Sequence, residues 1–362
     1  MPLIVDRALV REITFTSTAV GVIIITIFVV VRLVRFLSEA AAGDIPVDSI
    51  FLLLGLKLAS NLDVMLPMVF YVGILMVMNR WSRDHELIVL TASGIGLGRL
   101  LQPVMLMGVA LSVALTFSSF YLTPLSVRYT DTVTTENKNR VDIKGVVPGA
   151  FSETRGQDVY YVERMAKNKE LLINVFIYGE QPNKEGVVVA QTGHQYVDDL
   201  TGDRFLVLKN GTRYEGNPGQ ADYAVVEFET YALRIKTRSH VQAIITLKGV
   251  PTQDLLNSTD PRMAAEFHWR LAKPVSIIIL VLLAMSFTHY DVRRPQFYNT
   301  IMAFGAYFLY ANMLGYGSAL LRKGKIDPEL GLWWVHLTFV VIGVYIFSRR
   351  SRNRSLIPLP GR

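Results

Sequence analysis

Long apolar segments and one mostly polar stretch alternate along this chain. Three apolar runs come first, the polar stretch follows, and three more apolar runs complete the pattern. An apolar run of about 18 residues or more can cross the hydrocarbon core of a bilayer as a helix. The pattern therefore predicts six transmembrane helices, near residues 13–33, 50–78, 100–125, 271–290, 295–321 and 330–347.

Arginines at the ends of these runs predict the orientation. The short segments on the side of the termini carry more basic residues than the opposite ones, and Arg80, Arg83 and Arg99 are examples. Lysine and arginine accumulate in cytoplasmic loops. Both termini are therefore expected in the cytoplasm, and the polar stretch is expected outside it.

The polar stretch has the pattern of a β domain. Short runs rich in Val, Tyr, Phe, Ile and Thr alternate with turn residues, and several short strands at regular spacing indicate a sandwich, jelly roll or barrel. Asn210-Gly211 lies between two such runs and predicts a hairpin turn, because both residues tolerate positive φ. The predicted strands cover residues 158–162, 172–178, 186–196, 204–209 and 224–235.

Composition agrees with a membrane protein. The chain has 362 residues, of which 51% are hydrophobic, and a net charge of +7. Because the basic residues cluster at the ends of apolar runs, they indicate topology and lipid headgroups rather than nucleic acid. The absence of cysteine excludes disulfides and thiol catalysis.

Motifs for enzymatic chemistry are absent from the sequence. It has no GxxxxGK[ST] phosphate loop, no HExxH and no GxSxG, so intrinsic ATP hydrolysis and serine hydrolysis are not indicated. The six histidines lie far apart in sequence, which does not favour a metal site. We expect no cofactor bound by this chain.

Two features of the membrane segments have more than one interpretation. Arg32 and Arg35 share a helix face at the outer end of the first span, where they either snorkel to headgroups or bind an anionic lipid, with Lys323 and Lys325 on the same rim. Asp63 lies within the second span, near Lys57. An intramembrane acid suggests function, but we favour a structural or interfacial role over a proton relay.

The segment 79–96 separates the second and third spans. Charged residues occupy its first half and apolar residues its second half, and Gly94 and Gly96 can end a helix there. It is too short and too polar to cross the membrane. It is a surface connector, a helix lying along the membrane, or a helix docked in a groove of a cytosolic partner.

The sequence RDHELIVLTASG at 83–94 resembles the coupling-helix signature of the LptF/LptG family of lipopolysaccharide-export permeases. GDIP at 43–46 is similar to the family's first outer loop, and EFHWR at 266–270, GKIDP at 324–328 and LWWVH at 332–336 resemble LptF-type members in particular. His85 departs from the family pattern, in which a small polar residue is more usual, so the resemblance does not carry over the detail of the ATPase contact at this position.

The resemblance implies a permease subunit of an ABC transporter in the bacterial inner membrane. Its partners would be an LptG-type permease, an LptB ATPase dimer that uses the ATP, LptC, the periplasmic LptA bridge and lipopolysaccharide. Glu86, with Arg83 and Asp84, would contact the ATPase. Arg32, Arg35 and Lys323 would bind lipid A phosphates.

The resemblance also implies the organisation of the chain. Residues 1–127 would hold three transmembrane helices with a coupling helix near 80–94, residues 128–265 a periplasmic β-jelly-roll domain, residues 266–348 three more transmembrane helices, and residues 349–362 a basic cytoplasmic tail. The expected fold is thus a six-helix membrane domain with an inserted all-β domain.

Two other function classes remain open on the sequence. A membrane-anchored sensor or assembly factor would use the β domain to bind a periplasmic protein, but six spans exceed what an anchor needs. An intramembrane enzyme is supported only by Asp63 and the scattered histidines.

Overall fold

The structure is a computed structural model of the whole chain. It describes residues 2–41, 45–140, 148–153, 159–166, 171–181, 184–197, 204–216, 223–235, 245–288 and 296–351. The chain divides into two compact units. The first contains residues 1–32, 53–131 and 245–362, and the second contains residues 33–52 and 132–244. Each unit is described by itself.

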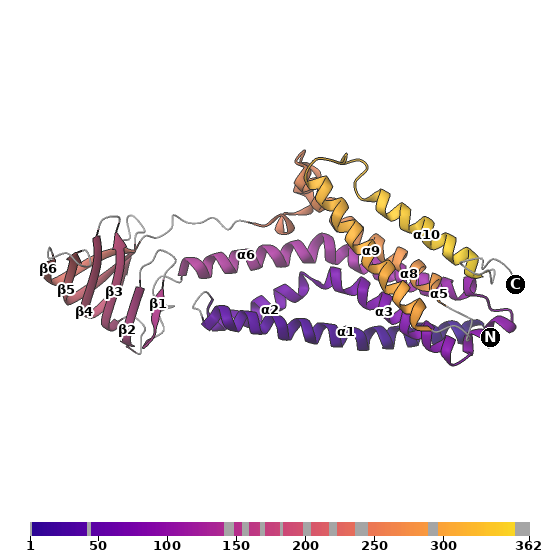
Figure 1. Cartoon of the computed structure of the whole chain (residues 1–362), viewed down its shortest axis with the longest axis horizontal. Coiled ribbons are helices and arrows are strands. Elements are labelled where there is room, and N and C mark those ends of the chain that lie inside the picture. Colours follow the sequence, from indigo (N-terminus) through magenta and orange to yellow (C-terminus); the bar gives the residue numbers. More distant parts are fainter. Residues whose placement is uncertain are drawn as a thin grey trace. The chain divides into compact units, whose positions relative to one another are not determined.

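Helices account for the apolar segments of the chain (Figure 1). The elements before the β strands are α1 (Pro2–Ala41), a 3₁₀ turn (Val47–Ser49), α2 (Ile50–Ala59), α3 (Leu62–Arg83), α4 (Glu86–Ala92), α5 (Leu97–Phe117), a π-helical turn (Ser118–Leu122) and α6 (Thr123–Arg140). Those after the strands are a 3₁₀ turn (Leu247–Gly249), α7 (Thr252–Leu256), α8 (Pro261–Ser286), α9 (Gln296–Arg322) and α10 (Trp333–Ser351).

Among the described helical segments, four are long and apolar enough to span a membrane: Ile4–Ala41, Leu62–Arg83, Leu97–Thr135 and Pro261–Ser286. Helices also form at the fifth and sixth predicted spans, but α9 and α10 fall outside this group. Asn, Gly and Tyr dilute the apolar character of α9, and Arg349 and Arg350 lie in the last turn of α10.

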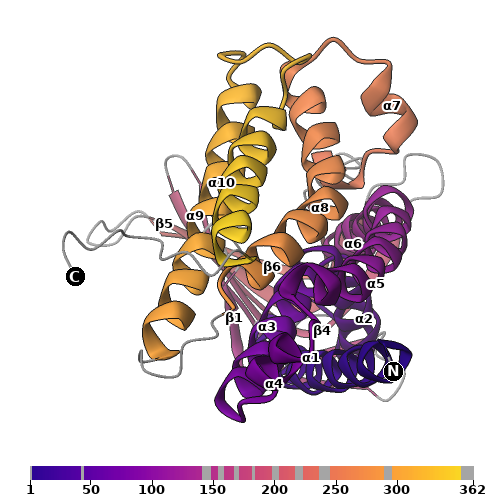
Figure 2. The same ribbon diagram turned by 90° about the vertical axis from the view of Figure 1, so that its right-hand side faces the viewer.

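Helix α8 is the centre of the helical unit. It packs against α3 and α5 on one side and against α9 and α10 on the other (Figure 2). Glycines permit two of these approaches, since a Cβ on Gly108 of α5 would lie 2.9 Å from Val281, and one on Gly343 of α10 would lie 2.9 Å from Leu282. Small residues allow helix backbones to come close within a membrane.

The second unit contains one antiparallel sheet. Its strands are β1 (Phe151–Glu153), β2 (Val159–Met165), β3 (Leu171–Gln181), β4 (Lys184–Val197), β5 (Arg204–Gly216) and β6 (Ala224–Ile235). They pair in sequence order, β1 to β6. Strands form in all five predicted places, and the sequence analysis missed β1. The jelly-roll topology is not found among the described strands, because each pairs with its neighbour in sequence instead of crossing between two sheets.

The hairpin predicted at Asn210-Gly211 is wrong, because both residues lie inside β5. Asn210 has a φ of 52°, as does Asn174 in β3. The strand registers place the two residues on one row across the sheet, together with Gln191 of β4 between them. Asparagine tolerates positive φ, and here it adopts this conformation within a strand. The result is a local irregularity of the strand and not a hairpin turn.

This row divides the apolar face of the sheet. Within β3, the buried side chains are Leu172 before Asn174, and Val175 and Ile177 after it. Side chains on one face normally recur every second residue, so the step of three across Asn174 shows that the left-handed residue resets the alternation. Apolar residues on both sides of the row therefore join one cluster.

Substitutions at Asn210 test this arrangement. Asn210→Val should destabilise β5 by about 1–2 kcal/mol, because a β-branched residue is strained at positive φ. Asn210→Gly should preserve the strand, since glycine adopts positive φ freely. Amide hydrogen exchange of β5 peptides in the full-length protein is expected to speed up for valine alone. Equal protection of the β5 amides in both variants would contradict the positive φ of Asn210.

Candidate functional site

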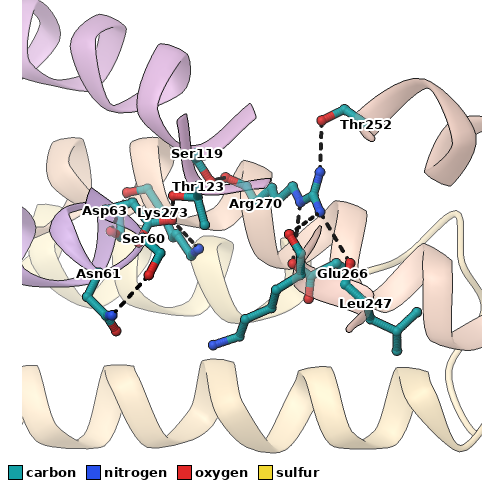
Figure 3. A network of polar contacts seen from close by, with 12 residues as sticks. Ser60, Asn61, Asp63, Ser119, Thr123, Leu247, Thr252, Glu266, Arg270 and Lys273 are labelled. Carbon is teal, nitrogen blue, oxygen red and sulfur yellow. Dashed lines mark hydrogen bonds and ion pairs between the residues drawn. The ribbon is translucent and has the colours of Figure 1, made fainter. Parts of the chain in front are cut away.

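A buried ion pair joins α3 to α8 (Figure 3). The Nζ of Lys273 on α8 lies 2.5 Å from the Oδ2 of Asp63, in the first turn of α3, and the Oγ1 of Thr123 donates to the same oxygen at 3.0 Å. Asp63 is fully buried and Lys273 almost so. Removing one partner of a buried pair leaves an uncompensated charge, so each residue depends on the other.

A second buried cation lies one turn earlier on α8. The Arg270 guanidinium is fully buried beside Glu266, with Nε 3.3 Å from Oε1, and donates to the Oγ1 of Thr252 at 2.9 Å (Figure 3). It also donates to the backbone carbonyls of Leu247, Lys248 and Val250. The segment that leads into α8 is therefore fastened to α8 by one side chain.

A proline explains a further contact of α8. Pro274 has no N–H, so it leaves the carbonyl of Arg270, four residues earlier, without its helical donor. The Oγ of Ser119, within the π-helical turn, donates to this carbonyl at 3.1 Å. The Oγ of Ser112 on α5 donates to the carbonyl of Pro274 itself at 2.9 Å. The buried Ser119 thus satisfies a backbone carbonyl that an apolar environment cannot.

The sequence analysis placed Lys57 near Asp63 and did not identify Lys273 or Arg270. Lys273 lies 210 residues from Asp63 in the chain, and only the packing of α8 against α3 brings them together. The signal that could have found it is the rule that charges inside spans pair with each other. The arrangement supports the structural role preferred for Asp63. No group of three or more His, Cys, Asp or Glu among the described residues could hold a metal ion.

The segment between α3 and α5 contains a shorter helix than predicted. Instead of one helix near 80–94, α3 continues to Arg83, and His85 adopts a φ of 64° before α4 begins. A left-handed residue cannot continue an α-helix, so His85 separates the two helices. Gly94 ends α4, with the N–H of Ile95 bonded to the carbonyl of Leu90 and that of Gly94 to Thr91. This pattern is a Schellman cap.

The three residues predicted to contact an ATPase lie together and are exposed. Arg83 ends α3 and lies 3.7 Å from Asp84 in the turn, while Glu86 opens α4. Leu87 is fully buried, whereas Ile88 and Val89 are exposed. Helix α4 is thus anchored by Leu87, with Leu90 packed against the same apolar cluster, and presents one acidic and two apolar side chains.

The predicted phosphate-binding residues are not brought together by any contact given for the described residues. Arg32 lies within α1, with its guanidinium 5.5 Å from the ring centroid of Phe28. Arg35 is exposed three residues later on the same helix, and Lys323 is exposed just after α9. Gly43, Asp44 and residues 352–362 of the predicted tail lie outside the described residues.

Comparison with known proteins decides the family. The model of the lipopolysaccharide export system permease LptF/LptG matches residues 7–349. The chain belongs to the LptF/LptG family. It is 26% identical to the lipopolysaccharide export system permease protein LptF of Escherichia coli K12 over 348 residues, 95% of this chain and 94% of that protein, and the same values hold for LptF of Shigella flexneri. An uncharacterized protein of Rickettsia prowazekii, RP871, is 19% identical over 84% of this chain and 88% of its own length.

Membership of this family places the buried polar contacts of α8 in a membrane protein. In an LptF/LptG permease, charged side chains between membrane helices must be paired. The pairs on α8 connect it to α3, to the π-helical turn and to the segment after the β strands. Helix α8 therefore holds these parts together.

The buried pair can be tested with Lys273→Met. This change leaves the Asp63 carboxylate buried without its cation and should cost about 3–5 kcal/mol of stability. The double variant Asp63→Asn with Lys273→Met is expected to recover much of the loss, because no charge then remains and asparagine still accepts from Thr123. Thermal unfolding in mild detergent measures both, with exposed Lys325→Met as the control. A single variant as stable as the control would contradict the pairing.

Proposed function

We propose that this protein is the LptF-type permease subunit of an ABC transporter that extracts lipopolysaccharide from the inner membrane for transfer toward the outer membrane. The family match over residues 7–349 carries the proposal. The sequence has no phosphate loop, so the energy comes from a separate ATPase, an LptB-type dimer. Its other partners are an LptG-type permease, LptC and the periplasmic LptA bridge.

External energy follows from the substrate. Removing an acyl chain from the bilayer opposes burial worth about 0.8 kcal/mol per CH₂, and lipid A carries several such chains. A passive site that bound this strongly would not release its ligand. ATP-driven conformational change resolves this conflict, because the same site can bind in one state and release in another.

The proposed orientation places both termini and α4 in the cytoplasm and the sheet in the periplasm. Helices α9 and α10 are the fifth and sixth spans of this proposal. Helix α9 exposes Tyr298, Phe308 and Tyr316, and mixed polar and aromatic side chains suit contact with a second permease better than lipid alone. The basic excess on the terminal side supports this orientation.

Helix α4 is the proposed coupling helix. Its exposed Glu86, Ile88 and Val89 suit a groove on the ATPase, with the carboxylate facing a basic residue there. Arg83 and Asp84 border this contact. The left-handed His85 fixes the angle at which α4 leaves α3, so its imidazole lies at the edge of the contact.

The sheet is the proposed acceptor for acyl chains. Its apolar cluster includes Val162, Val175, Ile177 and Leu208, with Phe228 packed against it. The first four of these side chains are almost fully buried, and such an apolar interior would shield acyl chains from water on their way to the periplasmic bridge. Residues on both sides of the row through Asn174 and Asn210 join this one cluster.

The coupling proposal is tested by Glu86→Gln. Truncating one partner of a desolvated charge pair costs about 2 kcal/mol or more, so the ATPase should bind at least about tenfold more weakly. The measurement is the amount of ATPase that co-purifies with each chain, together with lipopolysaccharide extraction from vesicles. Glu227→Gln, an exposed acid on β6, is the matched control. Unchanged extraction by Glu86→Gln would contradict the role of Glu86.

The lipid site is tested by replacing Arg32 and Arg35 together. With alanine at both, lipopolysaccharide crosslinking to a photoreactive residue at Val31 should fall about tenfold, since hydrogen bonds to charged groups are worth about 1.5–3 kcal/mol. With lysine at both, the charge remains and most crosslinking should persist. Lys323→Ala tests the third member. Normal crosslinking in the double alanine variant would assign the arginines to phospholipid headgroups instead.

A further inference from the structure

The cytoplasmic end of α1 packs against the residues around the coupling helix. Leu9 and Ile13 lie four residues apart, so they share one face of α1, and both are fully buried. Their apolar cluster contains Trp81 from α3 and Leu87 from α4. Val5, one turn earlier, packs against the same cluster. Burial of these side chains supplies the energy of the contact.

Two acidic residues of α1 add specific polar contacts to this packing. The Oε2 of Glu12 on α1 accepts from the guanidinium of Arg80 at 2.5 Å and from the indole Nε1 of buried Trp81 at 2.6 Å. The Oδ2 of Asp6, also on α1, accepts from the guanidinium of Arg99 at 2.9 Å. We refer to Asp6 and Glu12 as the α1 anchor.

The anchor reaches both sides of the coupling helix. Arg80 lies in the last turn of α3, before α4, and Arg99 lies in the first turn of α5, after α4. A helix bonded on only one side of α4 can swing about that point. Because α1 is bonded on both sides, a shift of the α3–α4–α5 turn must displace α1 as well.

The next turns of α1 continue the contact with α3. A Cβ on Gly73 would overlap the side chain of Ser17, and one on Gly21 would lie 3.3 Å from Val69. Beyond this point Ile23, Ile27 and Val31 are mostly exposed. Within the helical unit, α1 is therefore held along its first half, and its second half extends from that support.

We propose that α1 and the coupling segment move as one body, and that the α1 anchor transmits displacement of α4 to Arg32. Glu12 and Arg32 are 20 residues apart on one helix, which is about 30 Å, the thickness of a bilayer core. Asp6 and Glu12 are thus positioning residues that connect the ATPase contact with the outer end of α1. This inference rests on the proposed function.

The ion pairs of the α1 anchor fix the position of α1 relative to Arg80 and Arg99, but they add little to the free energy of folding. Its ion pairs are partly exposed, and such pairs contribute about 0–1 kcal/mol each. The apolar packing of Leu9 and Ile13 remains when the carboxylates are neutralised. Loss of the anchor is therefore expected to leave the fold and the ATPase contact intact and to affect the transmission of movement.

The test uses the complete complex of this chain with its second permease and its ATPase, reconstituted in vesicles that contain lipopolysaccharide. In Asp6→Asn with Glu12→Gln, ATP hydrolysis should stay near the wild-type rate while lipopolysaccharide extraction per ATP falls about tenfold, within the range of measured coupling energies. Arg11→Gln is the control, because it removes a charge beside Glu12 and its guanidinium makes no ion pair with another described residue. Exchange of one pair, Asp6→Arg with Arg99→Asp, should restore most of the extraction that Asp6→Asn alone loses.

The outcomes separate the two proposals. A wild-type complex that hydrolyses ATP but extracts no lipopolysaccharide would contradict the proposed function. If the wild type extracts and the double variant extracts equally well, the anchor is overturned while the function stands. A parallel loss of hydrolysis and extraction in the double variant, or a large drop in its thermal stability, would also overturn the anchor proposal. Asp6 and Glu12 would then serve folding or ATPase binding.

Discussion

Charged side chains buried between apolar helices must be paired, and this constraint organises the helical unit. Lys273 and Arg270 lie one turn apart on α8, and each has a carboxylate partner, Asp63 on α3 or Glu266 on α8. Desolvating these ions costs several kcal/mol each, so the pairs hold only in one geometry. This requirement sets the position of α8 against α3 and the π-helical turn.

The same constraint links the membrane helices to the extramembrane connection. Arg270 bonds to carbonyls of the segment that returns from the strands, and Asp131 of α6 accepts from the backbone N–H and the hydroxyl of Thr246 in that segment. Both connections are therefore fastened to the helical unit near α8. Elsewhere in the unit, α4 is held by the buried side chain of Leu87, and α1 is bonded to the end of α3 and the start of α5 on either side of it.

Local features of the fold follow from the sequence where one residue type has one strong preference. Gly94 ends α4 as expected, because this C-terminal cap requires a residue with positive φ. Runs rich in Val, Tyr, Phe, Ile and Thr predicted strands where β3 and β6 form. Asn210-Gly211 shows the limit of such rules, since the same tolerance for positive φ serves a turn in one context and an interrupted strand in another.

Long-range pairs did not follow from the sequence. Nothing near Asp63 in the chain points to Lys273, and the nearby Lys57 was a misleading partner. The acidic residues Asp6 and Glu12 also gave no signal, because their ion pairs form only when α1 packs beside the end of α3 and the start of α5. The family resemblance predicted an ATPase contact for Arg83, Asp84 and Glu86, whereas only the structure divided that segment at His85.

The central claim is that this chain transports lipopolysaccharide with energy from a separate ATPase. Its most direct test is quantitative mass spectrometry of everything that co-purifies with the tagged protein in mild detergent. The account predicts a cytosolic ATPase, a second permease of similar size and bound lipid A-containing lipid, in fixed proportion to the chain. Isolation of the chain alone, or with a periplasmic protein and no ATPase, would contradict it.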